Sequence, residues 1–178
     1  MALYQEMGEE FANTQKRSGL ACPTGCGYCC KTPTVEATVM EMIPMALALL
    51  EQDMAEEIYE RIQREKPETC IMYQDHGGKL GQCTQYATRP SLCRLFGVAG
   101  YYTKTHTKEL SICKELKAHY PDFQSIDINA LNPAMMSDWS TRLISIHPEM
   151  LQERLPISLA LSNALEKVML YSRLDASN

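Results

Sequence analysis

The sequence predicts a mainly helical protein with one small β-hairpin, an irregular α+β fold organised around a polycysteine metal site. Three observations favour this fold: apolar residues recur at helical spacing in several segments, two β-prone runs flank a Gly-Gly turn, and half of the eight cysteines lie between positions 22 and 30. The chain has 178 residues, within the usual range for one domain. We therefore expect a single domain over 1–178, with a metal-binding core at 20–115 and helical extensions on both sides.

The first half of the chain shows helical signals on both sides of the cysteine-rich stretch. Leu3, Met7 and Phe11 share one face of a helix predicted over 1–17, which ends near Gly19. Thr38 with Glu41 is a capping-box signature. The apolar stripe that follows contains Met42, Met45, Ala46, Leu49 and Leu50, with Pro44 inside it at a kink or in a first turn. Core packing is favoured over a copper site for the methionines at 40, 42 and 45.

A second helix is predicted over 52–66, and two more follow further along the chain. The face of the 52–66 helix carries Met54, Ile58, Tyr59 and Ile62. Cys113 opens or precedes a helix that runs through His119, and residues 101–107 are a short strand or a polar loop. The last helix, about 156–173, has as its core candidates Leu159, Leu161, Leu165, Val168 and Leu170.

A β-hairpin is predicted around Gly77-Gly78, because the β-prone runs 70–73 and 82–86 flank this turn. If the two runs pair, Cys70 and Cys83 lie on neighbouring strands at the same end. Downstream, Pro90 can start a helical turn that presents Cys93 one turn later.

The cysteine-rich stretch reads C-P-T-G-C-G-Y-C-C from Cys22 to Cys30, with spacing C-x3-C-x2-C-C. Glycines 25 and 27 allow the positive φ that a chain needs to wrap a small ion. A disulfide cluster and buried free thiols are the alternatives to soft-metal binding. No signal peptide is recognised, and a cytoplasmic location is expected. In a reducing cytosol clustered cysteines more often bind metal or act in catalysis, so metal binding is favoured.

The charge and the hydropathy pattern argue against two classes of partner. The net charge is −5 and the sequence pI about 5.4, so no basic field attracts nucleic acid or an anionic membrane. No run of about 18 apolar residues predicts a membrane span. An unknown protein partner is left open.

An all-sulfur site is favoured, because eight cysteines stand against four scattered histidines, His76, His106, His119 and His147. The adjacent pair Cys29-Cys30 is expected to diverge, so one centre and two centres both stay open. Arg89 and Arg94 flank Cys93 and would lower thiol pKa values, unless they pair with acids. No Walker loop, G-x-S-x-G or H-E-x-x-H is present, so an enzymatic role is uncertain. The C-x-x-C at 26–29 is disfavoured as a thiol–disulfide site, since no βαβ pattern surrounds it.

The C-x3-C-x2-C-C run, Cys70, and the motif G-x-C-x-x-Y-x-x-R-P-x-x-C-R-x-F over 81–96 resemble the YkgJ-type cysteine-cluster family. This family is also called the CxxCxxCC zinc- or iron-chelating domain, and some of its members are described as Fe–S oxidoreductases. A related cysteine region occurs in a flagellin lysine methylase. The first spacing here is x3 rather than x2, and Gly97 stands where proline is common.

The resemblance implies a metal-binding protein that holds zinc, iron or an iron–sulfur cluster, as a binding, structural or metal-handling module. The alternative is a redox protein with a [4Fe-4S]-type cluster. The implied metal ligands are Cys22, Cys26, Cys29, Cys30, Cys70, Cys83, Cys93 and Cys113.

Overall fold

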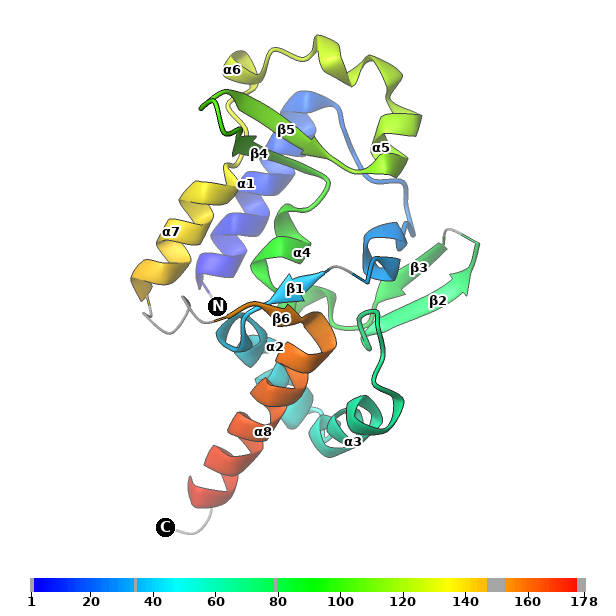
Figure 1. Cartoon of the computed structure of the whole chain (residues 1–178), viewed down its shortest axis with the longest axis vertical. Coiled ribbons are helices and arrows are strands. Elements are labelled where there is room, and N and C mark those ends of the chain that lie inside the picture. The colour runs from blue at the N-terminus through cyan, green and yellow to red at the C-terminus, as the bar shows by residue number, and fades with distance from the viewer. Residues whose placement is uncertain (1, 34, 79, 147–152, 176–178) are drawn as a thin grey trace.

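The structure is a computed structural model that describes residues 2–33, 35–78, 80–146 and 153–175. In these ranges it is dominated by helices, as predicted (Figure 1). The α-helices are α1 (Ala2–Ser18), α2 (Val39–Glu51), α3 (Ala55–Glu65), α4 (Ser91–Leu95), α5 (Lys114–His119), α6 (Ile128–Leu131), α7 (Met136–Ile146) and α8 (Ile157–Asp175). The strands are β1 (Glu36–Ala37), β2 (Tyr73–Gly77), β3 (Leu80–Cys83), β4 (Val98–Tyr102), β5 (Lys108–Ile112) and β6 (Leu155–Pro156). Short 3-10 helices are η1 (Tyr28–Lys31), η2 (Tyr86–Thr88) and η3 (Pro121–Ser125).

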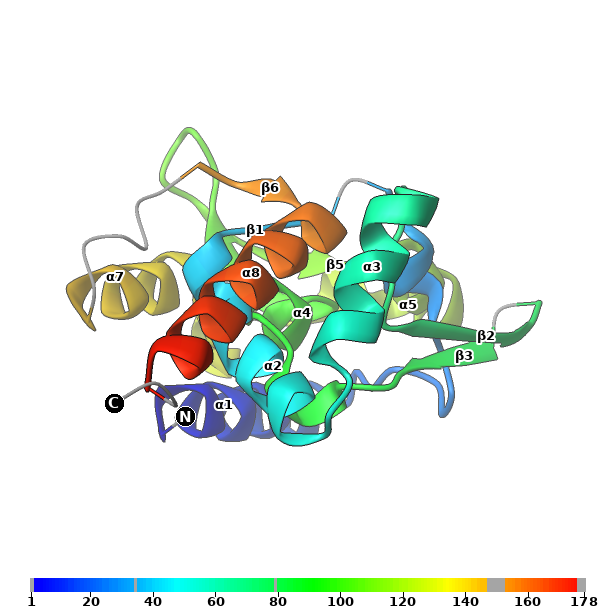
Figure 2. The ribbon, with the colours of Figure 1, turned by 90° about the horizontal axis from the view of Figure 1, so that it is seen from below.

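The largest apolar core lies where α2 and α3 pack against α8 (Figures 1 and 2). Helix α2 begins at the predicted capping box, in which Thr38 and Glu41 exchange hydrogen bonds between side chain and backbone. Its fully buried residues include Met42 and Met45, so the predicted core role of these methionines is confirmed. Pro44 lies inside the helix rather than in its first turn.

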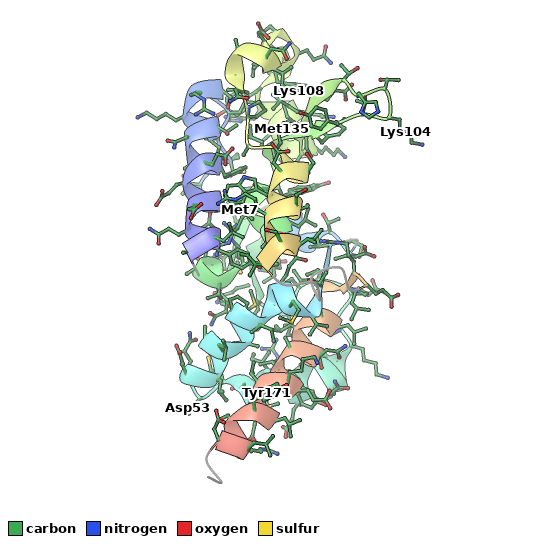
Figure 3. The ribbon with its side chains drawn as sticks, turned by 90° about the vertical axis from the view of Figure 1, so that its left-hand side faces the viewer. Met7, Asp53, Lys104, Lys108, Met135 and Tyr171 are labelled. Carbon is green, nitrogen blue, oxygen red and sulfur yellow. The ribbon has the colours of Figure 1, made fainter. Side chains whose placement is uncertain are left out.

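A second core lies between α1, α7 and β4. Met7 and Trp139 are fully buried there, and Leu3 and Phe11 pack against this core or its neighbour, as the N-terminal periodicity predicted. Figure 3 shows α1 and α7 side by side, with Met7 between them. Gly100 of β4 packs against Met135, so a larger residue at position 100 would overlap it.

Three two-stranded antiparallel sheets are present in the described ranges, where only one hairpin was predicted. Strands β2 and β3 form the predicted hairpin, which projects to one side of the helices in Figures 1 and 2. Strands β4 and β5 form a second hairpin. The sequence had left residues 101–107 open as either a short strand or a polar loop. The third sheet pairs β1 with β6 and so joins distant parts of the chain, which no local pattern could predict.

The helical bounds match the sequence closely, but three side chains of the predicted core are wrong. Leu159 and Leu170 are 44% and 57% exposed on α8, and Met54 is 36% exposed just before α3. The buried face of α8 runs instead through smaller residues such as Ala160 and Ala164, beside the correctly predicted Leu161 and Leu165. No helix in the described ranges is long and apolar enough to span a membrane.

Candidate metal centre

The cysteine-rich stretch forms two tight turns between α1 and β1. Gly25 has φ +72°, the left-handed conformation that glycine adopts without strain, as the sequence indicated. The Cys26 amide donates to the Pro23 carbonyl at 3.0 Å, and the Cys30 amide donates to the Gly27 carbonyl at 3.0 Å. The second of these bonds starts helix η1, which carries both Cys29 and Cys30.

The β2–β3 hairpin is fastened to this stretch. The Gly81 amide donates to the Gly25 carbonyl at 2.9 Å, and Lys31 Nζ lies 3.1 Å from an Asp75 carboxylate oxygen. The Tyr73 ring lies against Gly27 and Gly81, where any Cβ would overlap it. Gly27 is therefore needed for close packing, and its own φ of −104° is not in the left-handed region.

Five cysteines line one small cavity at the junction of η1, the hairpin, α4 and α8. The cavity measures about 30 Å³. Organic ligands and cofactors occupy pockets roughly ten times larger, so its size suits a small inorganic group. The lining residues are Cys29, Cys30, Val35, Met45, Cys70, Cys83, Arg89, Pro90, Leu92, Cys93, Phe96 and Ile157.

Cys29 and Cys30 do not diverge, which corrects the expectation for adjacent cysteines. Their sulfur atoms lie 4.0 Å apart, and both line the cavity. A hydrogen bond from the Cys30 thiol lowers the pKa of Cys29 to about 6, assisted by the Arg89 charge. Donating this bond raises the pKa of Cys30, and burial adds to the effect. One of the two sulfurs is thus a thiolate near neutral pH.

Cys70 and Cys83 both reach the cavity, but only Cys83 lies on a strand. It pairs with Tyr73, whereas Cys70 lies in the turn that precedes β2, where its carbonyl accepts from the Tyr73 amide at 3.0 Å. Burial raises the pKa of Cys70 to about 12 and also raises the pKa of Cys83. Hydrogen bonds from the amides of Met72 and Gln85 oppose these shifts.

Cys93 reaches the cavity from α4, which begins just after Pro90 as the R-P-x-x-C spacing predicted. Burial raises its pKa to about 12. Arg89 also lines the cavity and lowers the pKa values of four cysteines, which are Cys22, Cys29, Cys83 and Cys93. No carboxylate of the described residues forms an ion pair with it. Its guanidinium lies 3.4 Å from the centre of the Tyr86 ring and its Nε donates to the Tyr86 carbonyl at 3.1 Å, so the cation is held beside the cavity and acts on the sulfurs electrostatically.

Arg94 does not line the cavity, although the same role was predicted for it as for Arg89. Its guanidinium lies 4.9 Å from the centre of the Tyr4 ring, and its Nε donates to the Arg89 carbonyl at 2.8 Å. Arg94 thus holds the backbone of the neighbouring arginine.

The remaining cysteines, Cys22, Cys26 and Cys113, lie outside the cavity lining. Cys22 is exposed and its sulfur lies close to Gly97 and Leu116. Cys113 precedes α5 and its sulfur accepts from the Leu116 amide at 3.4 Å. Burial and then the charge of Cys113 raise the pKa of Cys22 to about 11. Ligation of metal by these three residues stays a prediction.

The donor set fits a soft metal, although the sulfurs have not converged on one point. All eight cysteines are free, so the disulfide alternative is not observed. No three Cys, His, Asp or Glu side chains in the described ranges are placed to hold one metal ion as they stand. The 4.0 Å between Cys29 and Cys30 sulfurs is nevertheless close to the ~3.8 Å that separates two thiolates bound tetrahedrally at about 2.3 Å to zinc.

No histidine of the described residues lines the cavity. His76, His106 and His119 are exposed, and none of them lines it. His147 lies outside the described residues.

Several cavity residues were not singled out from the sequence as parts of the site. Val35, Phe96 and Ile157 close it with apolar surface, and Met45 contributes from the core helix α2. Ile157 is the first residue of α8, about 130 positions from Cys29, and no sequence pattern links the two. The family motif contains Phe96, which was the one available signal.

A family model for the CxxCxxCC domain, described as a "putative zinc- or iron-chelating domain", matches residues 21–130. The matched range contains all eight cysteines. No curated protein and no solved structure gives a significant match to the chain.

Proposed function

Because this chain belongs to the CxxCxxCC cysteine-cluster family, we propose that it binds a single zinc or iron ion in the cavity formed by five of its cysteines. The ligands are drawn from Cys29, Cys30, Cys70, Cys83 and Cys93. The observation that carries the proposal is the Cys29–Cys30 sulfur distance of 4.0 Å on the wall of this cavity. A tetrahedral thiolate site needs this spacing between its ligands.

The charges around the cavity favour the binding of a cation. A lowered Cys29 pKa supplies one thiolate before any metal arrives, and Arg89 stabilises negative charge on the others. Four thiolates around a divalent cation leave two negative charges, and the guanidinium offsets part of this excess. Apolar neighbours such as Val35 and Ile157 exclude water, which strengthens each of these interactions.

The binding role is structural or metal-handling, since the ion would join four segments of the chain. Helix η1, the turn before β2, the end of β3 and helix α4 each contribute cavity cysteines. A bound ion of this kind stabilises the fold, because the unfolded chain has no preformed site. In the cytoplasm, where we place the protein, the thiols would stay reduced.

An iron–sulfur redox role is the second candidate, and one observation favours it. The cavity is lined by five cysteines and no histidine, and iron–sulfur clusters take thiolates almost exclusively. The three cysteines outside the cavity would supply further thiolates. In this case the Arg89 charge and the amide hydrogen bonds near Cys70 would tune a reduction potential.

Metal content of anaerobically purified protein tests the proposal. We expect about one zinc or iron per chain without acid-labile sulfide, and a loss of at least half of the metal in Cys83→Ser and in Cys93→Ser. His76→Ala is the matched control, because this exposed side chain does not reach the cavity. A brown protein with sulfide, and a band near roughly 400 nm that dithionite bleaches, would establish the redox candidate instead. A metal-free wild-type protein after anaerobic reconstitution would contradict both.

A further inference from the structure

Glu41 is a buried acid. Burial of its carboxylate is unfavourable, and its role in the helix cap alone does not explain why it is buried. It is 3% exposed at the start of α2. A buried carboxylate is unfavourable unless it is fully paired. One of its oxygens, Oε2, accepts from the Thr38 amide at 2.9 Å and from Arg154 at 3.4 Å. This half of the carboxylate completes the capping box, and an exposed glutamate would serve that purpose equally well.

The other oxygen, Oε1, accepts a short hydrogen bond from the hydroxyl of Ser91. Ser91 is itself buried and is the first residue of α4. Its neighbours Arg89 and Cys93 stand two residues to either side, and both line the cavity. The carboxylate of α2 is therefore attached to the segment that carries a cavity thiol and the cavity cation.

A second contact joins the same elements. Tyr4 of α1 donates its hydroxyl to the Glu41 carbonyl at 3.1 Å. The ring of Tyr4 lies beneath the guanidinium of Arg94, which in turn donates to the carbonyls of Arg89 and Ala87. Figure 1 shows α4 beside α1. The segment 87–94 is thus held at the Ser91 hydroxyl by Glu41 and at its backbone carbonyls by Arg94.

We infer that Glu41 is a positioning residue of the metal centre, which acts through Ser91 to hold Cys93 and Arg89 at the cavity wall. This inference rests on the proposed metal-binding function. Residues that orient metal ligands from behind typically contribute 10–100-fold to metal affinity. Glu41 and Ser91 differ from such partners only in that they restrain the backbone of the ligand instead of its sulfur.

Competition with a chromophoric chelator measures the effect on affinity. We expect Ser91→Ala and Glu41→Ala to weaken zinc binding by roughly tenfold. In Glu41→Gln the amide oxygen can still accept from the Thr38 amide, and the NH2 group can donate to the Ser91 hydroxyl, which can also accept, so we expect this variant to retain affinity within about threefold. Ser162→Ala is the matched control, because Ser162 is also buried and hydrogen-bonded, to Gln63 at 2.7 Å, but away from the cavity. In a Cys93→Ser background the Ser91→Ala effect should shrink to the part that acts through Arg89.

A measurement on metal-free protein separates this inference from the metal-binding proposal. Alkylation followed by peptide mass spectrometry should show Cys93 several-fold more reactive in Ser91→Ala than in wild type, with Cys70 unchanged and Ser162→Ala without effect. Equal Cys93 reactivity in all three proteins would overturn the positioning role, even if the wild type binds metal. A wild type that binds no metal, together with the altered Cys93 reactivity, would refute the proposed function and leave the restraint on Cys93 established.

Discussion

The sulfur atoms of Cys29 and Cys30 lie 4.0 Å apart, and a hydrogen bond between them makes the two thiols chemically unequal. A hydrogen bond from the Cys30 thiol lowers the pKa of Cys29 to about 6, below that of an ordinary cysteine. The unequal pair explains how one segment presents both a thiolate and a thiol to the same cavity.

Removing the donor should make Cys29 less acidic. In metal-free Cys30→Ala, we expect the pKa of Cys29 to rise toward the ordinary value, so that its thiolate fraction at pH 7 falls by about tenfold or more. The rate of alkylation of Cys29 by iodoacetamide between pH 5 and 9, read by mass spectrometry, reports this shift. Cys30→Ser is the matched control, because a hydroxyl still donates. An unchanged profile in Cys30→Ala would show that the pair is not the cause.

Metal affinity should rise with pH over the whole neutral range. Burial holds the pKa values of Cys70 and Cys93 near 12 in the metal-free protein, so both are protonated at pH 7 and must release protons when they bind metal. Each released proton increases the association constant by about tenfold per pH unit. With at least these two protons released, we expect a rise of at least about 100-fold from pH 6.5 to pH 7.5, measured by chelator competition. An affinity independent of pH would exclude these two residues as ligands.

Arg89 should contribute to binding through its charge. Replacing it in Arg89→Gln removes the cation that favours the thiolate form of Cys29, Cys83 and Cys93. We expect a loss of metal affinity of roughly tenfold, while Arg89→Lys keeps the charge and loses less. Arg64→Gln is a suitable control, because Arg64 is an exposed arginine whose ion pair is with Glu65 on α3. Equal affinity in Arg89→Gln and Arg64→Gln would contradict the role of this cation.

The parts of the site that are local in sequence could be predicted, and the parts that need long-range contacts could not. Periodicity and capping identified α1, α2 and α8, and the R-P-x-x-C spacing placed Cys93 in a helical turn. The expectation that adjacent Cys29 and Cys30 diverge was wrong, since their sulfurs lie 4.0 Å apart and both line one cavity. The other walls of this cavity come from distant segments, so adjacency in the sequence does not decide where the two side chains point.

Arg94 and Glu41 illustrate a second limit. Both arginines flank Cys93 and were predicted to act on its sulfur, but Arg89, which precedes α4, lines the cavity, and Arg94 on α4 lies against the ring of Tyr4. The capping box correctly placed Glu41 at a helix start. Its bond to Ser91, 50 residues further along the chain, depends on how two helices pack, which no local spacing encodes.

The contact of the Tyr73 ring with Gly27 and Gly81 leads to a last prediction, which concerns the stability of the hairpin. Gly81→Ala adds a methyl group that overlaps the edge of the Tyr73 ring, so either the ring or the hairpin must move. Overpacking of this kind costs about 1–3 kcal/mol of unfolding free energy. Urea unfolding should show this loss in Gly81→Ala, whereas Gly8→Ala, where the nearest atom outside the helix lies at 3.8 Å, should be neutral or slightly stabilising.

The double variant Gly81→Ala with Tyr73→Ala tests the cause directly. Without the ring, the added methyl group has space, so the second substitution should remove most of the cost of the first. A cost that stays the same in the Tyr73→Ala background would show that Gly81 is required for another reason. Because Cys83 follows Gly81 on β3, a displaced hairpin should also carry its sulfur away from the cavity. Gly81→Ala should therefore weaken metal binding, and Tyr73→Ala should restore it in the double variant.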